Sequence, residues 1–98
     1  MPKAYMVVQY RSVAKPEKIA DYAKLAGPAI QAQGGKFLVR STPAKTYEAG
    51  LGERTVVVEF PSLEAARAAY EGPAYAEALR VLGKDTAVRD MRIVEGVE

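Results

Sequence analysis

The chain has 98 residues, a length that suits one domain with one hydrophobic core. It contains no cysteine and no histidine, which excludes disulfides, thiolate nucleophiles, thiolate-bound metals and imidazole as a base or as a ligand to haem or metal. The formal net charge is +2 and the basic and acidic residues are interspersed, so the sequence shows no footprint of nucleic-acid or membrane binding.

The N-terminal residues carry no apolar signal region, and the longest apolar runs are too short to span a bilayer. We therefore expect a cytoplasmic protein with neither a membrane partner nor a nucleic-acid partner. Any metal would have to be held by oxygen atoms alone, and we expect no metal site. The whole of residues 1–98 is expected to form a single domain.

The first strand is predicted at residues 4–11, which are rich in β-branched and aromatic side chains. A helix is predicted to begin at Pro16, since proline is favoured in the first turn. Its apolar stripe continues past Pro28, where we expect a kink or a short break because proline cannot donate to the carbonyl four residues back. The glycines at 34–35 are expected to end this helix.

A second strand is predicted at residues 36–40, with Pro43 bending the chain after it. Residues 45–49 could resume pairing as the first arm of a hairpin whose turn lies at 50–52. The third strand is predicted at 54–60, the densest β-branched run in the chain.

Ser62 is the expected N-cap of a second helix. A Gly-Pro pair at 72–73 breaks this helix, and the apolar spacing that follows predicts a further short helix. The last strand is predicted at 90–95. The order β-α-β-β-α-β is the ferredoxin-like arrangement, an α+β fold in which a four-stranded antiparallel sheet carries its helices on one face.

Alternation along the predicted strands gives the sheet two different faces. The apolar set is expected under the helices: Ala4, Met6, Val8, Tyr10, Phe37, Val39, Val56, Val58, Phe60, Met91 and Ile93. The second set is mixed: Tyr5, Val7, Gln9, Arg11, Leu38, Arg40, Thr55, Val57, Glu59, Arg92 and Val94. An apolar patch of this kind marks a contact surface, and arginine is favoured at interfaces. We therefore predict a face-to-face homodimer, with a monomeric open-faced sheet as the alternative.

Several stretches resemble one known family. They are Ala4-Tyr5, residues 34–40, residues 58–66, Tyr70, residues 72–75 and residues 93–96. Together they are similar to domain of unknown function 1330, within the dimeric α+β-barrel superfamily, over nearly the whole chain. The resemblance implies that two four-stranded sheets pack into a dimeric α+β barrel. It implies little about chemistry. Relatives include cofactor-free monooxygenases, haem-degrading enzymes, lactone isomerases and ligand-sensing regulatory domains, and the missing histidine excludes haem degradation.

Glu59 is the candidate catalytic residue, because a carboxylate in a partly desolvated interface can have a raised pKa and act as an acid–base group. The structural alternative is an ion pair with Arg40, Arg11 or Arg92. Tyr5 could orient a ligand carbonyl or hydrogen-bond across the dimer, and the same two roles are open to Gln9 on this face.

Three tyrosines on the helix side could line a pocket between helices and sheet, with their hydroxyls at its mouth: Tyr22, Tyr70 and Tyr75. Packing in the core is the alternative for all three. The first functional hypothesis is a homodimeric α+β-barrel protein that binds a small metabolite without a cofactor. The alternative is a cofactor-independent enzyme, monooxygenase-like or isomerase-like, that acts on a small carbonyl or phenolic compound with Glu59 as acid–base and Arg40 or Arg92 holding an anion. An enclosed cavity that touches Glu59 or Tyr70 would favour the enzyme.

Overall fold

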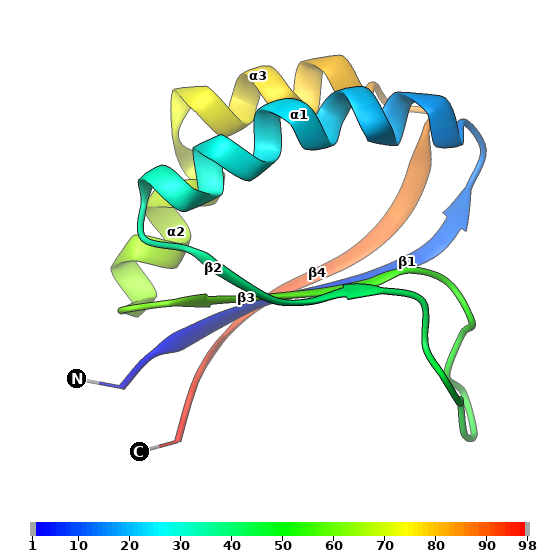
Figure 1. The fold of residues 1–98 in the computed structure, drawn as a ribbon, viewed down its shortest axis with the longest axis horizontal. Coiled ribbons are helices and arrows are strands. Elements are labelled where there is room, and N and C mark those ends of the chain that lie inside the picture. The colour runs from blue at the N-terminus through cyan, green and yellow to red at the C-terminus, as the bar shows by residue number, and fades with distance from the viewer. Residues whose placement is uncertain (1, 98) are drawn as a thin grey trace.

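The structure, a computed structural model, describes residues 2–97. Its elements in chain order are β1 (Ala4–Val13), α1 (Pro16–Ala32), β2 (Lys36–Ser41), β3 (Thr55–Phe60), α2 (Leu63–Glu71), α3 (Pro73–Leu82) and β4 (Ala87–Glu95). The strands form one antiparallel sheet in the order β2-β3-β1-β4. All three helices lie on one side of this sheet (Figure 1), and no element of residues 2–97 covers the other side. The predicted α+β fold is confirmed.

The helix boundaries follow the local signals. Ser62 caps α2, because its hydroxyl accepts a hydrogen bond of 3.1 Å from the Ala65 amide. Gly34 takes a φ of +85° just after α1, a backbone conformation that glycine adopts without strain. The predicted short break at Pro28 is wrong: α1 runs through it, since a proline removes only one hydrogen bond of the ladder.

The segment between β2 and β3 differs from the prediction. Residues 45–49 form no strand, and the whole stretch 42–54 is a loop, so the expected hairpin arm is wrong. Glu48 has a φ of +51°, which turns the backbone away from an extended path. Conversely, β4 begins at Ala87 rather than at residue 90, because its pairing with β1 continues past an irregularity as far as Val13.

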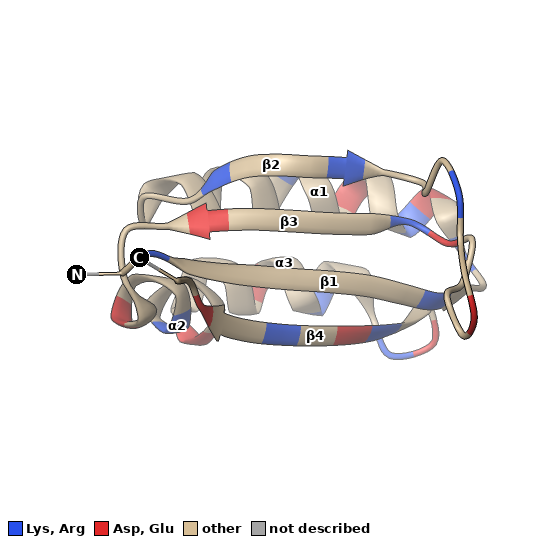
Figure 2. Cartoon of the chain, turned by 90° about the horizontal axis from the view of Figure 1, so that it is seen from below, with Lys and Arg blue, Asp and Glu red and all other residues tan. Residues whose placement is uncertain are grey.

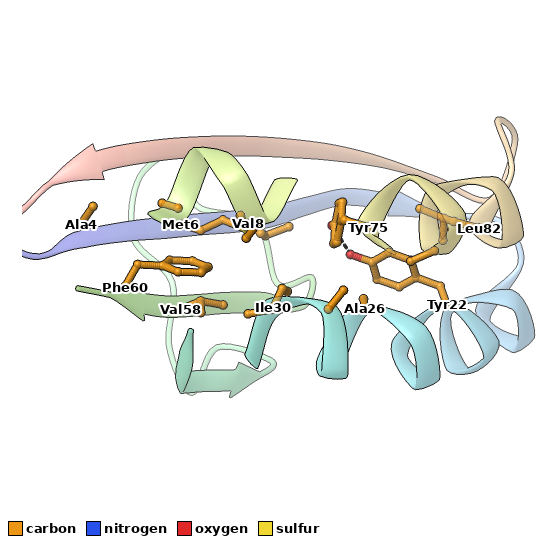
Figure 3. Close-up of a cluster of buried hydrophobic side chains, with 14 of the residues drawn as sticks. Ala4, Met6, Val8, Tyr22, Ala26, Ile30, Val58, Phe60, Tyr75 and Leu82 are labelled. Carbon is orange, nitrogen blue, oxygen red and sulfur yellow. Dashed lines mark hydrogen bonds between the residues drawn. The ribbon is translucent and has the colours of Figure 1, made fainter. Parts of the chain in front are cut away.

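The core beneath the helices is fully buried at the end of the sheet where β1 begins. Met6 and Phe60 are 1% and 0% exposed there, beside Val58 (Figure 3). Gly35 closes this end, because a Cβ on it would lie 2.9 Å from the Phe60 ring. The apolar set of the sheet was therefore placed correctly on β1 and β3.

A bulge in β2 changes the faces of two residues. Phe37 pairs with Val58, as the alternation predicts, but the register shifts at Leu38. Val39 then pairs with Val57 on the open face, and Arg40 pairs with Val56 on the helix face. The predicted faces of Val39 and Arg40 are wrong, because one extra residue in a strand moves every later side chain to the opposite face.

None of the described helices has the length and apolar character that crossing a membrane requires.

Candidate functional site

A cavity of about 50 Å³ lies between α1 and the sheet. Its walls are largely apolar and come from β1, β2 and β3 on one side and from α1 on the other. The polar part of the lining consists of three tyrosines and three arginines: Tyr10, Tyr22, Tyr75, Arg40, Arg54 and Arg89. The lining, which falls entirely within the described residues, contains no aspartate or glutamate.

The sheet brings the three arginines to the same end of the molecule. Arg89 of β4 is the cross-strand neighbour of Tyr10. The carbonyl of Arg54, just before β3, accepts a 3.0 Å hydrogen bond from the Tyr10 amide. Arg40 arrives from β2 because the bulge turns it toward the helices. Three separate segments thus place cations around one cavity.

Two helices contribute a buried pair of phenols. Tyr22 of α1 and Tyr75 of α3 are 8% and 1% exposed, and their hydroxyl groups share a hydrogen bond (Figure 3). Their rings meet edge to face with centroids 5.9 Å apart. Arg89 Nη1 donates a 2.9 Å hydrogen bond to the Tyr22 hydroxyl. The pair is therefore joined directly to one of the arginines.

The charge states of this cluster follow from its burial. Burial raises the pKa of the Tyr22 phenol above its ordinary value, Tyr75 raises it further, and Arg89 opposes the rise. Burial also raises the pKa of Tyr10. Burial alone would lower the pKa of Arg89, but the oxygens of Tyr22 and Tyr75 outweigh that effect and raise it. At neutral pH the Tyr10 and Tyr22 phenols are therefore neutral and the Arg89 guanidinium is charged.

Two of the three cations of the cavity, Arg40 and Arg89, contact aromatic faces instead of carboxylates. The Arg89 guanidinium carbon lies 5.0 Å from the Tyr22 ring centroid, and that of Arg40 lies 4.4 Å from the Phe37 centroid. Within residues 2–97, none of Arg40, Arg54 and Arg89 forms a salt bridge. The positive charge around the cavity is therefore not neutralised locally.

The predicted tyrosines fall into two groups. Tyr22 and Tyr75 line the cavity as expected, although the Tyr75 hydroxyl is deeply buried and not at the mouth. Tyr70 is 37% exposed and packs its ring against Tyr75, with centroids 5.1 Å apart. It borders open grooves beside β4 and does not line the cavity.

The other candidates lie on the open face, which Figure 2 shows toward the viewer. Glu59 is bonded to the Tyr5 hydroxyl at 3.2 Å and to Lys3 Nζ at 3.4 Å. The predicted ion pair of Glu59 with an arginine is absent among the described residues. The open-face arginines bond to an aspartate instead.

That aspartate is Asp90, which the prediction did not include. It accepts hydrogen bonds of 3.1 Å from Arg11 and 3.2 Å from Arg92. Gln9 is its cross-strand neighbour on β1 and is exposed. Glu59 and Asp90 thus lie on the open face, on the side opposite the cavity.

Residues 3–97 match the family described as Domain of unknown function (DUF1330). The chain belongs to the DUF1330 family. No curated protein matches it.

Solved structures share the fold of this DUF1330 protein. A protein of unknown function from Rhodopseudomonas palustris has 20% identity and a TM-score of 0.72, covering 99% of this chain and 84% of its own. SnoaB, a cofactor-independent oxygenase from Streptomyces nogalater, has 12% identity and a TM-score of 0.67, with coverage of 100% and 96%. A dimeric ferredoxin-like protein from Thermobifida fusca has 14% identity and a TM-score of 0.61, with coverage of 96% and 91%. These likenesses establish the ferredoxin-like fold.

Sequence reasoning did not select Arg54 and Arg89 as site residues of the DUF1330 protein. A usable signal existed for both. Arg54 stands two residues before Val56, and Arg89 stands two residues before Met91, so alternation places each on the apolar face. An arginine that continues the apolar alternation of a strand indicates that the covered face has a polar end, where a cavity can form.

Proposed function

We propose that this DUF1330 protein binds a compact small molecule, without a cofactor, in the cavity between α1 and the sheet. The observation that supports the proposal is the combination of apolar walls with Arg40, Arg54 and Arg89, which have no carboxylate partner in residues 2–97. Ligand sites in proteins are typically apolar concavities with a few convergent polar groups.

The size of the cavity limits the ligand. Its volume of about 50 Å³ is well below the several hundred Å³ of a pocket for a drug-sized compound. Only a molecule with few heavy atoms would be enclosed, or one end of a larger molecule. Gly27 on α1 lines the cavity, and a Cβ there would meet no heavy atom within 4 Å. This glycine leaves room for the ligand to enter.

Native mass spectrometry of the purified protein tests the proposal. We expect a retained small molecule on the wild-type chain and on Gly52→Leu, a loop variant whose added side chain would also start in open space. Gly27→Leu should lose it, because the leucine side chain would extend into the cavity. Retention by Gly27→Leu equal to that of the wild type would refute binding in this cavity.

We also propose that the protein is a homodimer that packs through its open sheet face. Apolar side chains remain on that face in the single chain: Val94 is 49% exposed and Val39 is 42% exposed. Structural neighbours from Thermobifida fusca and Bacteroides fragilis are described as dimeric. A surface of this composition is one that a second copy would cover.

Cofactor-independent catalysis is the third proposal, supported by the fold shared with the oxygenase SnoaB. Glu59 and Arg40 lie on opposite faces of the sheet, which argues against their joint action on one ligand within a protomer. The cavity touches neither Glu59 nor Tyr70, so our criterion for the enzyme is not met there. The direct assay is oxygen consumption with simple phenols. If the protein consumed no oxygen, only the binding proposal would stand.

A further inference from the structure

The hydroxyl pair in the cavity has more hydrogens than acceptors. Tyr22 and Tyr75 share one hydrogen bond, so one phenolic hydrogen lies between their oxygens. Arg89 can only donate, and it donates to Tyr22 at 2.9 Å. The second phenolic hydrogen therefore has no acceptor among residues 2–97. A buried donor without a partner costs free energy, so the cluster favours an incoming acceptor.

The charge around the pair specifies what kind of acceptor fits. Arg89 belongs to the cluster itself, and Arg40 and Arg54 line the same cavity. No acidic side chain of the described residues lines it. Tyr10 and Tyr22 do not supply negative charge, since burial holds both phenols in the neutral form. An acceptor that also carries negative charge would complete both the hydrogen bonding and the charge balance.

The walls and the volume restrict the anion further. Apart from the polar cluster the lining is apolar, and the space is about 50 Å³. A phosphate dianion needs many donors around a tetrahedral group, whereas a carboxylate is flat, singly charged and satisfied by a fork of donors at one end. The remainder of a carboxylic acid can be apolar, as these walls require.

We infer that the cavity binds a small organic monocarboxylate. Its carboxylate accepts hydrogen bonds from the Tyr22–Tyr75 pair and from Arg89, and its apolar part lies along the cavity toward Gly27. This inference rests on the proposed binding function and names its ligand class. Tyr22 and Tyr75 would supply the phenolic donors, and the charge of the three arginines would select the carboxylate over a neutral analogue.

Titration of the full-length protein, followed by NMR, tests the ligand class. The probes are propionate and benzoate, their neutral isosteres propionamide and benzamide, and inorganic phosphate. We expect the carboxylates to bind at least about tenfold more tightly than the amides, because hydrogen bonds to a charged acceptor are the stronger kind. Phosphate should bind more weakly than either carboxylate.

Variants locate the carboxylate. Tyr22→Phe and Tyr75→Phe each keep the ring and remove one hydroxyl, and each should weaken carboxylate binding by about tenfold. Tyr70→Phe is the matched control, since Tyr70 lies outside the cavity and should leave the affinity unchanged. Gly27→Leu should abolish binding. If one phenylalanine variant failed to fold, the other would still report on the pair.

The outcomes separate this inference from the proposed function. Amides or phosphate binding as tightly as carboxylates, at a site that Gly27→Leu blocks, would overturn the ligand class while keeping the cavity as a binding site. Carboxylate affinity that is unchanged in both phenylalanine variants would also overturn it. If no probe bound and no small molecule were retained in mass spectrometry, both proposals would fall.

Discussion

The helix-covered face and the open face of the sheet are built from the same four strands, yet they carry charge differently. On the open face, Glu59 bonds to Lys3, and Asp90 bonds to Arg11 and Arg92. On the covered face, three arginines surround a cavity and form no salt bridge within residues 2–97. Figure 2, seen from the open side of the sheet, marks acidic positions among basic ones along the ribbons of β3 and β4.

This difference indicates what kind of partner, a second protein copy or a small anion, each face would bind. The carboxylates of Glu59 and Asp90 on the open face already bond to cations of the same chain, and exposed apolar side chains remain there for a second copy to cover. Charges on the covered face are unmatched, so what remains to be supplied there is an anion. Under the two proposals above, one face would serve association and the other ligand binding.

The largest effect should come from placing a carboxylate on the open face. Val57→Asp would bury an unpaired charge in the proposed dimer, which costs several kcal/mol. We expect monomers or insoluble protein by light scattering coupled to size exclusion. Ala20→Asp adds the same charge at an exposed position of α1 and should leave the assembly unchanged. A stable Val57→Asp dimer would contradict sheet-to-sheet packing.

The next largest effect is a loss of stability at the end of the covered face where Phe60 is buried. Phe60 is 0% exposed, so Phe60→Ala should reduce the free energy of unfolding by about 3–5 kcal/mol in urea denaturation. Val88→Ala, at a residue that is 55% exposed, is the control and should change it by less than about 0.5 kcal/mol. A small loss for Phe60→Ala would show that burial at this end contributes little to stability.

Glu59→Gln should reduce stability less than the loss of a buried carboxylate–arginine pair would. Its partner Lys3 has a side chain that is 60% exposed, and such pairs contribute about 0–1 kcal/mol. We expect the melting temperature to fall by no more than a few degrees. Lys3→Met should reproduce the change if the ion pair is its cause. A clear rise in stability would move Glu59 back to the head of the catalytic candidates.

The smallest effect is a pH dependence of stability that comes from Asp90 on the open face. A hydrogen bond from Arg92, together with one from Arg11, holds the pKa of Asp90 below its ordinary value. Because the folded-state pKa is the lower one, Asp90 stabilises the fold at neutral pH and loses this effect as the pH falls below about 4. Thermal melts should show Asp90→Asn slightly less stable than wild type at pH 7 and equal to it in strong acid. A gap that persists in acid would contradict this linkage.

Alternation and capping signals were enough to predict most of the fold. The period of two in β1 and β3 sorted Met6, Val58 and Phe60 correctly onto the covered face, because both strands pair without interruption over those residues. Ser62 predicted the start of α2, since an N-cap acts within a few residues of itself. Tyr22 and Tyr75 were predicted to line a pocket on the helix side, where they do lie.

Local pattern by itself thus determined the element order, the two faces of β1 and β3 and the helix side of the tyrosines. Tertiary structure alone decided which of these side chains meet at the cavity. A bulge at Leu38 turned Arg40 into the cavity, because register depends on the partner strand and not on the strand's own periodicity. Tyr22 meets Tyr75 across 53 positions and Arg89 across 67, and such contacts arise only when helices and sheet pack together.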